Sequence, residues 1–110
     1  MGNVYLLECI NKDGITYKIG FTKGDIQNRV KALQVGNGYE IKELSSFSTK
    51  YDQKLESTLH KYFKHCRLKG EWFNLEQNDI DNFTEICKRI ENNFNSLKDN
   101  PFFNNFITRY

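Results

Sequence analysis

The first part of the chain carries a hydrophobic pattern typical of two β-strands. Residues 4–10 are mostly apolar and β-prone, and a run this short without helix caps predicts a strand. Residues 11–14 form a turn signal in which Gly14 can adopt a positive φ. Residues 15–21 predict a second strand, so we expect a β-hairpin at the start of the chain.

Apolar positions at helical spacing begin directly after the hairpin. Either Asp25 or Thr22 can cap a helix that continues to about residue 34. The sequence Gly-Asn-Gly at residues 36–38 is expected to end this helix. The apolar face of the predicted helix consists of Ile26, Val30 and Leu33.

The middle and the end of the chain predict one more strand and two more helices. Residues 39–47 alternate between apolar and polar side chains, as in a strand, although the alternation slips near Glu43. Both later helices have an apolar stripe that would face the core. The expected starts are Ser48 or Thr49 and Asn78 or Asp79, and the stripes comprise Leu55, Leu59, Tyr62 and Phe63, then Ile80, Phe83, Ile86, Cys87, Ile90 and Phe94.

The order of these elements is ββαβα, followed by a short extended segment at residues 71–75 and a last helix. This order predicts a mixed α/β (α+β) fold around a small sheet. A chain of 110 residues favours one domain with one core, which we assign to residues 1–97. We expect the apolar tail at residues 98–110 to dock on this domain, on a partner protein or on a second copy as a homodimer.

Charge modifies this picture only locally. The formal net charge is +2, a small excess for a nucleic-acid-binding domain. Basic residues concentrate between Lys50 and Lys69, which could form a phosphate-facing patch or a solvated helix face. Charge alone favours the solvated face. The basic residues of this stretch are Lys50, Lys54, Lys61, Lys64, Arg67 and Lys69, with His60 and His65 among them.

Cysteine usage and hydropathy limit the cellular setting. The chain has three cysteines and no CxxC pair, which argues against a disulfide framework and a structural zinc site. No apolar run approaches the roughly 18–20 residues of a membrane span, and the start of the chain lacks signal-peptide features. We therefore expect an intracellular protein, cytoplasmic or nuclear, with reduced thiols and no membrane association.

Several polar residues are candidates for chemistry. Tyr5 and Tyr17 lie on two adjacent predicted strands, where they could approach each other if they shared a face. Glu56 and His60 are four residues apart and therefore share one face of a predicted helix. Arg29 lies on the polar side of the first predicted helix. Each of these residues taken alone is as readily explained as a structural tyrosine, a surface ion pair or a helix surface pair.

The order and spacing of several motifs are more specific than any single residue. Together they resemble the GIY-YIG nuclease superfamily, and most closely its T5orf172 or Mug113-like branch, which occurs in phages and large DNA viruses. The resemblance covers about residues 3–75. The motifs are Val4-Tyr5-Leu6, Tyr17-Lys18-Ile19-Gly20-Phe21-Thr22, Arg29, Leu33, Glu56-Ser57-Thr58-Leu59-His60 and Gly70-Glu71-Trp72-Phe73.

The resemblance implies a three-stranded antiparallel sheet flanked by helices, with the active site on one face. It assigns Tyr5 to activation of the attacking water, Arg29 to the scissile phosphate and Glu56 to a divalent metal, Mg²⁺ or Mn²⁺. These residue types suit phosphodiester hydrolysis, which needs an activated water and stabilised charge on the phosphoryl oxygens. An arginine fork matches phosphate oxygens, and one carboxylate with phosphate and water suits Mg²⁺.

The chain also departs from the superfamily pattern. Asn3 replaces a glycine in the first motif, and Lys18 replaces the usual tyrosine of the second. Tyr17 is one residue early, and neighbouring strand residues point to opposite faces, so it could substitute only across a bulge. Lys18 is therefore expected to take that position and to neutralise phosphate charge. Asn74 is a candidate for the late asparagine of the superfamily.

Three functions follow as hypotheses. The first is a metal-dependent endonuclease, with DNA as the expected substrate and with His60 touching phosphate or metal-bound water. The second is a weak or inactive nucleic-acid-binding module with the same fold. The third is an interaction protein that uses its apolar tail. The expected catalytic residues are Tyr5, Tyr17, Lys18, Arg29, Glu56 and His60, and the expected nucleic-acid-binding residues are Lys23, Lys31, Lys64, Arg67, Lys69 and Asn74.

Overall fold

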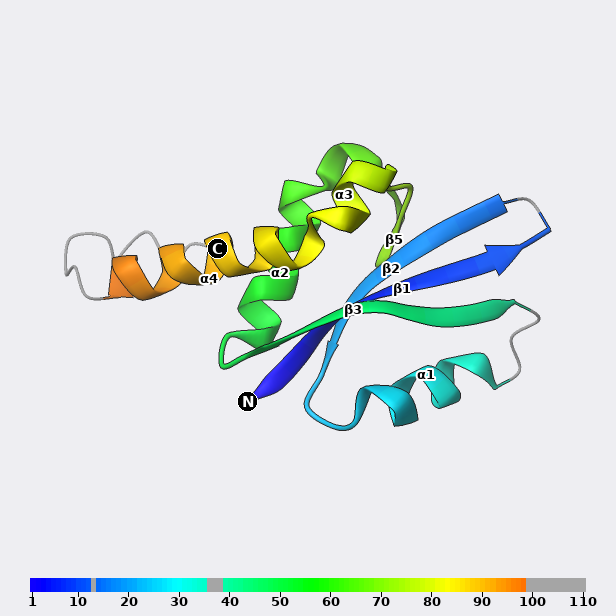
Figure 1. Cartoon of the computed structure of the whole chain (residues 1–110), viewed down its shortest axis with the longest axis horizontal. Coiled ribbons are helices and arrows are strands. Elements are labelled where there is room, and N and C mark those ends of the chain that lie inside the picture. Colours follow the sequence, from blue (N-terminus) through cyan, green and yellow to red (C-terminus); the bar gives the residue numbers. More distant parts are fainter. Residues whose placement is uncertain (13, 36–38, 99–110) are drawn as a thin grey trace.

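A five-stranded antiparallel sheet forms the centre of the molecule (Figure 1). The computed structural model describes residues 1–12, 14–35 and 39–98. The strand order is β3-β1-β2-β5-β4, with the first strand of the chain in the interior of the sheet. The strands are β1 (Gly2–Asn11), β2 (Gly14–Thr22), β3 (Glu40–Thr49), β4 (Arg67–Lys69) and β5 (Trp72–Phe73).

The predicted hairpin is confirmed. Strands β1 and β2 pair antiparallel from Asn3 opposite Thr22 to Asn11 opposite Gly14. Gly14 has a φ of 132°, as expected for a turn that needs glycine. The predicted α+β class with an antiparallel sheet is likewise confirmed. The expected number of three strands is wrong, because β5 adds to β2 and β4 adds to β5.

The slip in the hydrophobic alternation of the third strand corresponds to a β-bulge. Strand β3 pairs with β1, with Leu6 opposite Ser45 and Leu7 opposite Glu43. Leu44 is the extra residue between these two pairs, so the faces of β3 exchange there. The break in the apolar–polar alternation near Glu43 therefore coincides with a bulge in the sheet.

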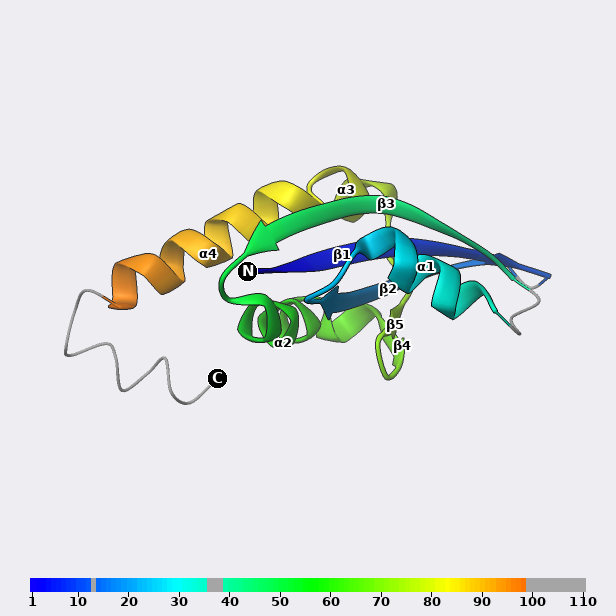
Figure 2. The same cartoon turned by 90° about the horizontal axis from the view of Figure 1, so that it is seen from below.

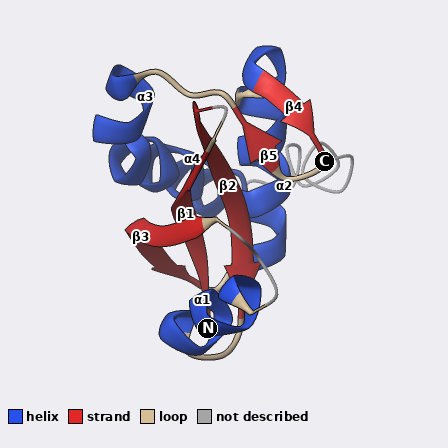
Figure 3. Ribbon diagram, turned by 90° about the vertical axis from the view of Figure 1, so that its right-hand side faces the viewer, coloured by secondary structure: helices blue, strands red, loops and turns tan. Residues whose placement is uncertain are grey.

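The helices cover both faces of the sheet (Figure 3). Helix α1 packs Val30 and Leu33 on one face, against Tyr5 and Leu7 of β1. Helices α2 and α4 cover the other face, and α4 extends past the end of the sheet where the N-terminus lies (Figures 1 and 2). The helices are α1 (Ile26–Gln34), α2 (Asp52–Tyr62), α3 (Gln77–Asp81) and α4 (Phe83–Lys98), with a 3₁₀ turn at Lys64–Cys66.

Two predicted helix boundaries are wrong, one because of a long-range strand pairing and one because of a local side-chain hydrogen bond. Strand β3 continues through Ser48 to Thr49, because Thr49 pairs with Gly2 of β1, and α2 therefore starts at Asp52. The predicted last helix is divided at Asn82, whose side-chain amide donates to the carbonyl oxygen and the side-chain oxygen of Asn78. Such a side chain competes with continuous helical hydrogen bonding.

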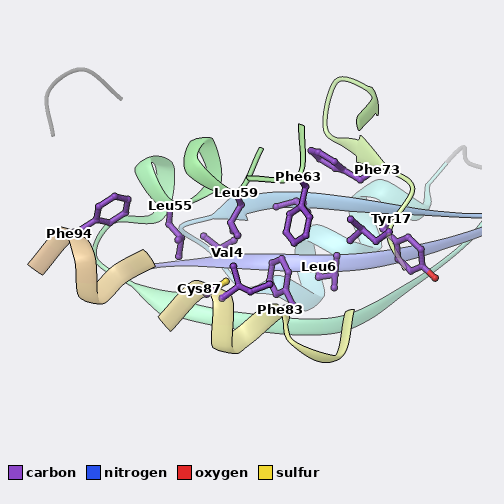
Figure 4. Packing of buried hydrophobic residues seen from close by; sticks show 13 residues of the cluster. Val4, Leu6, Tyr17, Leu55, Leu59, Phe63, Phe73, Phe83, Cys87 and Phe94 are labelled. Atoms are coloured by element: carbon purple, nitrogen blue, oxygen red, sulfur yellow. The ribbon is translucent and has the colours of Figure 1, made fainter. Parts of the chain in front are cut away.

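The larger of two cores lies between the sheet and helices α2 and α4 (Figure 4). Its fully buried aromatic residues are Phe63, Phe73 and Phe83, and large rings of this kind contribute strongly to a small core. All three cysteines carry free thiols, and burial raises the pKa of Cys87 to about 12. Among the described helices, none is both long enough and apolar enough to span a bilayer.

Two sequence predictions concern residues outside the described part of the chain. The first is the glycine-rich end of α1 at residues 36–38, and the second is the apolar tail, which lies outside from residue 99 onward. Of the two predicted N-caps of α1, Asp25 is the one in the structure, because its side chain accepts a hydrogen bond from the backbone N–H of Gln27.

Candidate active site

The Tyr5 ring lies across Gly20 on the neighbouring strand. The two residues are direct partners in the β1–β2 register, and Tyr5 is 1% exposed. A Cβ atom at residue 20 would lie 2.5 Å from the Tyr5 hydroxyl oxygen and within 3 Å of its ring. The glycine of the second motif therefore provides the space in which the tyrosine of the first motif lies.

Arg29 approaches Tyr5 from helix α1. Its Nε donates a hydrogen bond of 3.4 Å to the Tyr5 hydroxyl oxygen. The interaction with Tyr5, first through this hydrogen bond and then through charge, raises the pKa of the Arg29 guanidinium, with a smaller contribution from Glu71, so the group stays cationic. Arg29 is otherwise exposed, and the guanidinium has further N–H groups for an anionic ligand.

The sheet register places Lys18, and not Tyr17, on the face of Tyr5. Lys18 pairs with Leu7, two residues beyond Tyr5, so the two side chains share a face. Lys18 is 7% exposed, its Nζ lies 2.5 Å from Glu71 Oε2, and it stacks over the Trp72 ring at 5.2 Å. The buried ammonium therefore has an anionic partner in the turn between β4 and β5.

Tyr17 lies on the opposite face of the sheet from Tyr5 and Lys18. It belongs to the core beneath α2 and α4, and its direct strand partner at β5 is Phe73 (Figure 4). Burial, and then the negative charge of Glu8, raise the pKa of the Tyr17 hydroxyl. The structure therefore places Tyr17 away from Tyr5, because no bulge in the β1–β2 pairing rotates it toward that face.

Glu56 and His60 of helix α2 reach the outer edge of β2. The backbone N–H of Phe21 donates to the Glu56 carboxylate, and His60 Nε2 lies 2.9 Å from the Ile19 carbonyl oxygen. The Ile19 N–H donates to the backbone carbonyl of Glu71 at 3.1 Å. These contacts continue the edge of β2 beyond its pairing with β5, which ends at Lys18. Two helix side chains and one turn therefore meet at a strand edge.

Electrostatics at this edge favour the neutral form of Glu56 when no cation is present. Burial raises the pKa of Glu56 to about 7, and the negative charge of Glu71 adds to the increase. The charge of Lys18 and the hydrogen bond from Phe21 act in the opposite direction and are smaller. The His60 Nε2 atom lies 3.8 Å from Glu56 Oε1, which is too long for a hydrogen bond.

Glu56, His60 and Glu71 form a cluster that could hold a metal ion. Each offers one ligand atom, and these atoms lie within 4.8 Å of one another. Two carboxylates with bound water are typical ligands of Mg²⁺ and Mn²⁺, and imidazole is a ligand of softer divalent ions. His60 is fixed by its contact with Ile19 and by edge-on packing against the Phe73 ring, with centroids 5.1 Å apart.

Comparison with protein-family models matches residues 2–91 to the T5orf172 domain. The chain belongs to the T5orf172 domain family. The match begins with β1 and extends into α4, so it includes all five strands and the helices that build both cores. Comparisons with curated proteins and with solved structures found no match. The family consists of nuclease-like, DNA-binding domains.

Glu71 is the residue of this T5orf172 domain that sequence reasoning missed. It belongs to the motif Gly70-Glu71-Trp72-Phe73, in which no role was predicted for the carboxylate. Its proximity to Lys18 and Glu56 depends on the pairing of β5 with β2. The sequence signal that could have identified Glu71 is its place between a turn glycine and an aromatic pair.

The predicted nucleic-acid-binding residues of the T5orf172 domain fall into separate places. Lys23 forms an ion pair of 2.8 Å with the buried Asp52 at the start of α2, which ties the end of the hairpin to that helix. Lys64 and Arg67 line a pocket beside α2. The remaining three residues are exposed, and they are Lys31 on α1, Lys69 on β4 and Asn74 after β5.

Proposed function

We propose that this T5orf172 domain is a metal-dependent endonuclease of the GIY-YIG type that hydrolyses phosphodiester bonds in DNA. The observation that carries the proposal is the convergence of two sets of groups at β2. Arg29 Nε lies 3.4 Å from the Tyr5 hydroxyl oxygen on one face of the sheet. The Glu56–His60–Glu71 cluster lies at the edge of β2, where Glu71 pairs with Lys18 of that same face. The proposal is supported by a cation and a hydroxyl group that suit phosphate on one face of β2, together with carboxylates at its edge that suit a metal.

The cluster suits a divalent cation because its carboxylates are held close together and partly buried. The pKa of about 7 for Glu56 reflects the cost of placing its negative charge there beside Glu71. A bound Mg²⁺ or Mn²⁺ would polarise a phosphoryl oxygen and acidify a bound water. Coordination through His60 Nε2 would break its contact with the Ile19 carbonyl, so we assign the metal to the carboxylates and contact with phosphate or metal-bound water to His60.

The remaining residues have roles that follow from their contacts. Arg29 would donate to the scissile phosphate and offset the charge that develops on its oxygens. Tyr5, once deprotonated to the phenolate, would accept a proton from the attacking water, with its oxygen held by the hydrogen bond from Arg29. Lys18 would contact phosphate once Glu71 turns toward the metal, because an ammonium buried with one partner can exchange one anion for another.

The Lys18–Glu71 ion pair also favours a second candidate function. Lys18 stands where the second motif usually has a tyrosine, and its charge is neutralised by Glu71. A site that lacks this tyrosine could bind nucleic acid without cutting it. Binding that weakens with salt, without cleavage under any divalent metal, would identify this binding module.

Cleavage of supercoiled plasmid and of a branched DNA tests the proposal directly. Each substrate is incubated with Mg²⁺, Mn²⁺ or EDTA, using the natural protein, Glu56→Gln and the control Glu40→Gln, which alters an exposed glutamate of β3. We expect cutting with metal by the natural protein and by the control, and none by Glu56→Gln. Equal cutting by Glu56→Gln would refute the assigned role of Glu56.

A further inference from the structure

A basic hollow lies beside the proposed metal site, on the outer side of helix α2. It has a volume of about 330 Å³ and is lined by Ser57, His60, Lys61, Lys64 and Arg67. Ligand pockets begin at about 300 Å³, so this hollow suits one phosphate group with part of its sugar. The lining offers hydroxyl, ammonium and guanidinium groups, and these are donors to phosphate oxygens.

The hollow is continuous with the metal site through His60. This residue lines the hollow and also lies 3.8 Å from Glu56. Ser57 and Lys61 are one turn apart on α2, and Lys64 follows in the 3₁₀ turn. One turn of α2 rises about 5.4 Å. This length corresponds to one or two steps between successive phosphates of a DNA strand, which are about 3.4 Å apart along the axis. A strand whose scissile phosphate lies at Glu56 would therefore bring a phosphate one or two nucleotides away into the hollow.

Arg67 is held in an orientation that suits this role. Its Nε donates to the Gly70 carbonyl oxygen at 2.7 Å, which fixes the guanidinium across the β4–β5 turn. The other N–H groups of the fork can then donate to an anion in the hollow. The same turn carries Glu71, so the turn connects the hollow to the Lys18–Glu71 ion pair.

We propose that the hollow binds an internal phosphodiester of the substrate strand, one or two nucleotides from the cleaved bond. The position relative to the cleaved bond rests on the proposed nuclease function, but the phosphate site itself does not. It would fix the register of the strand without reading its bases, because phosphate contacts position nucleic acid and base contacts specify sequence.

The test is duplex DNA binding in EDTA, measured by fluorescence anisotropy over a range of salt concentrations. The variant Lys61→Gln/Lys64→Gln removes two charges from the hollow, and the control Lys88→Gln/Arg89→Gln removes two from the exposed side of α4. Each lost phosphate contact reduces the slope of log K against log salt by about 0.9. We expect a reduction of about 1 for the hollow variant and a much smaller change for the control, and equal changes would overturn the proposal.

A second arm separates an internal phosphodiester from a terminal phosphate. A neutral methylphosphonate is placed at successive linkages of the oligonucleotide, and inorganic phosphate is titrated while the amide signals of His60 and Lys64 are followed by NMR. One internal methylphosphonate position that weakens binding in the natural protein but not in the hollow variant supports the proposal. Saturation by inorganic phosphate without any sensitive internal linkage would overturn it.

The measurements do not depend on catalysis. If no DNA is cleaved but the hollow variant still reduces the slope of log K against log salt, the nuclease is refuted and the phosphate site is retained. Cleavage that requires Glu56, with a slope unaffected by the hollow variant, would refute the phosphate site alone. Thermal melting of both double variants verifies that the fold is retained, since all four substituted residues are exposed.

Discussion

Tyr5 and Gly20 face each other across β1 and β2 so closely that a side chain at residue 20 would overlap the tyrosine ring. A Cβ atom there would lie 2.5 Å from the Tyr5 hydroxyl oxygen. The pairing explains in physical terms why a glycine occupies this position of the second motif. It also connects the fold to the proposed chemistry, because the Tyr5 hydroxyl oxygen accepts the hydrogen bond from Arg29.

We predict that Gly20→Ala displaces the Tyr5 ring and reduces both stability and cleavage. Overpacking of a buried position costs about 1–3 kcal/mol, and displacement of Tyr5 would break its contact with Arg29. Urea denaturation measures the stability, and plasmid cleavage measures the activity. Gly24→Ala is the matched control, because the nearest atom to a Cβ there is 3.8 Å away. Full activity of Gly20→Ala would show that the position of the tyrosine ring is unimportant.

Stability of the metal-free protein should fall as pH rises from about 5 to 8. The pKa of Glu56 is raised from 4.5 to about 7 in the folded protein, so between these values the folded state binds more protons than the unfolded state. Its stability therefore decreases with pH. The full shift corresponds to at most about 3 kcal/mol, reduced by solvent access.

Thermal melting in EDTA across this pH range provides the measurement. Glu56→Gln is expected to remove most of the decrease, since glutamine does not titrate, whereas Glu40→Gln on the exposed part of β3 should retain it. The same pH profile in the natural protein and in Glu56→Gln would contradict the assignment.

Glu71→Gln should destabilise the protein more than the double variant Lys18→Gln/Glu71→Gln. The single change leaves the Lys18 ammonium, which is 7% exposed, without its partner at 2.5 Å. Loss of one partner of a buried pair is costly mainly because the other charge stays buried. Because the Glu71 side chain is 39% exposed, we expect a penalty of about 1–2 kcal/mol.

A double-mutant cycle from urea denaturation measures this coupling. The variants are Lys18→Gln, Glu71→Gln and the pair together. Additive effects of the two single changes would show that the Lys18–Glu71 contact contributes nothing to stability.

Local sequence patterns were sufficient for most of the long elements. Hydrophobic runs and the turn at Gly14 predicted the hairpin, and one of the two expected caps, Asp25, starts α1. The slip in alternation near Glu43 coincides with the bulge in β3. Each of these features depends on residues within a few positions of one another. Strand alternation alone also predicted that Tyr17 does not share a face with Tyr5. The register agrees, because Lys18 is the residue on that face.

Most of the features that were missed depend on residues distant in sequence. Strand β5 is two residues long and exists because it pairs with Tyr17 and Lys18. The position of Glu71 beside Lys18 follows from that pairing. The negative charge of Glu71 then adds to the increase that burial causes in the pKa of Glu56. Likewise, Thr49 belongs to β3 because of its pairing with Gly2. A propensity-based interpretation cannot include such long-range contacts.

Addition of Mn²⁺ or Mg²⁺ should stabilise the natural protein, and more at pH 8 than at pH 5.5. A ligand that binds only the folded state at 100 times its dissociation constant adds about 2.7 kcal/mol. Protons compete with the metal for Glu56, because its pKa of about 7 leaves the carboxyl neutral at the lower pH. Differential scanning fluorimetry with metal titration measures the shift, and EDTA should reverse it. Glu56→Gln should lose the shift and Glu40→Gln should keep it. An equal shift in Glu56→Gln would place the metal elsewhere on the protein.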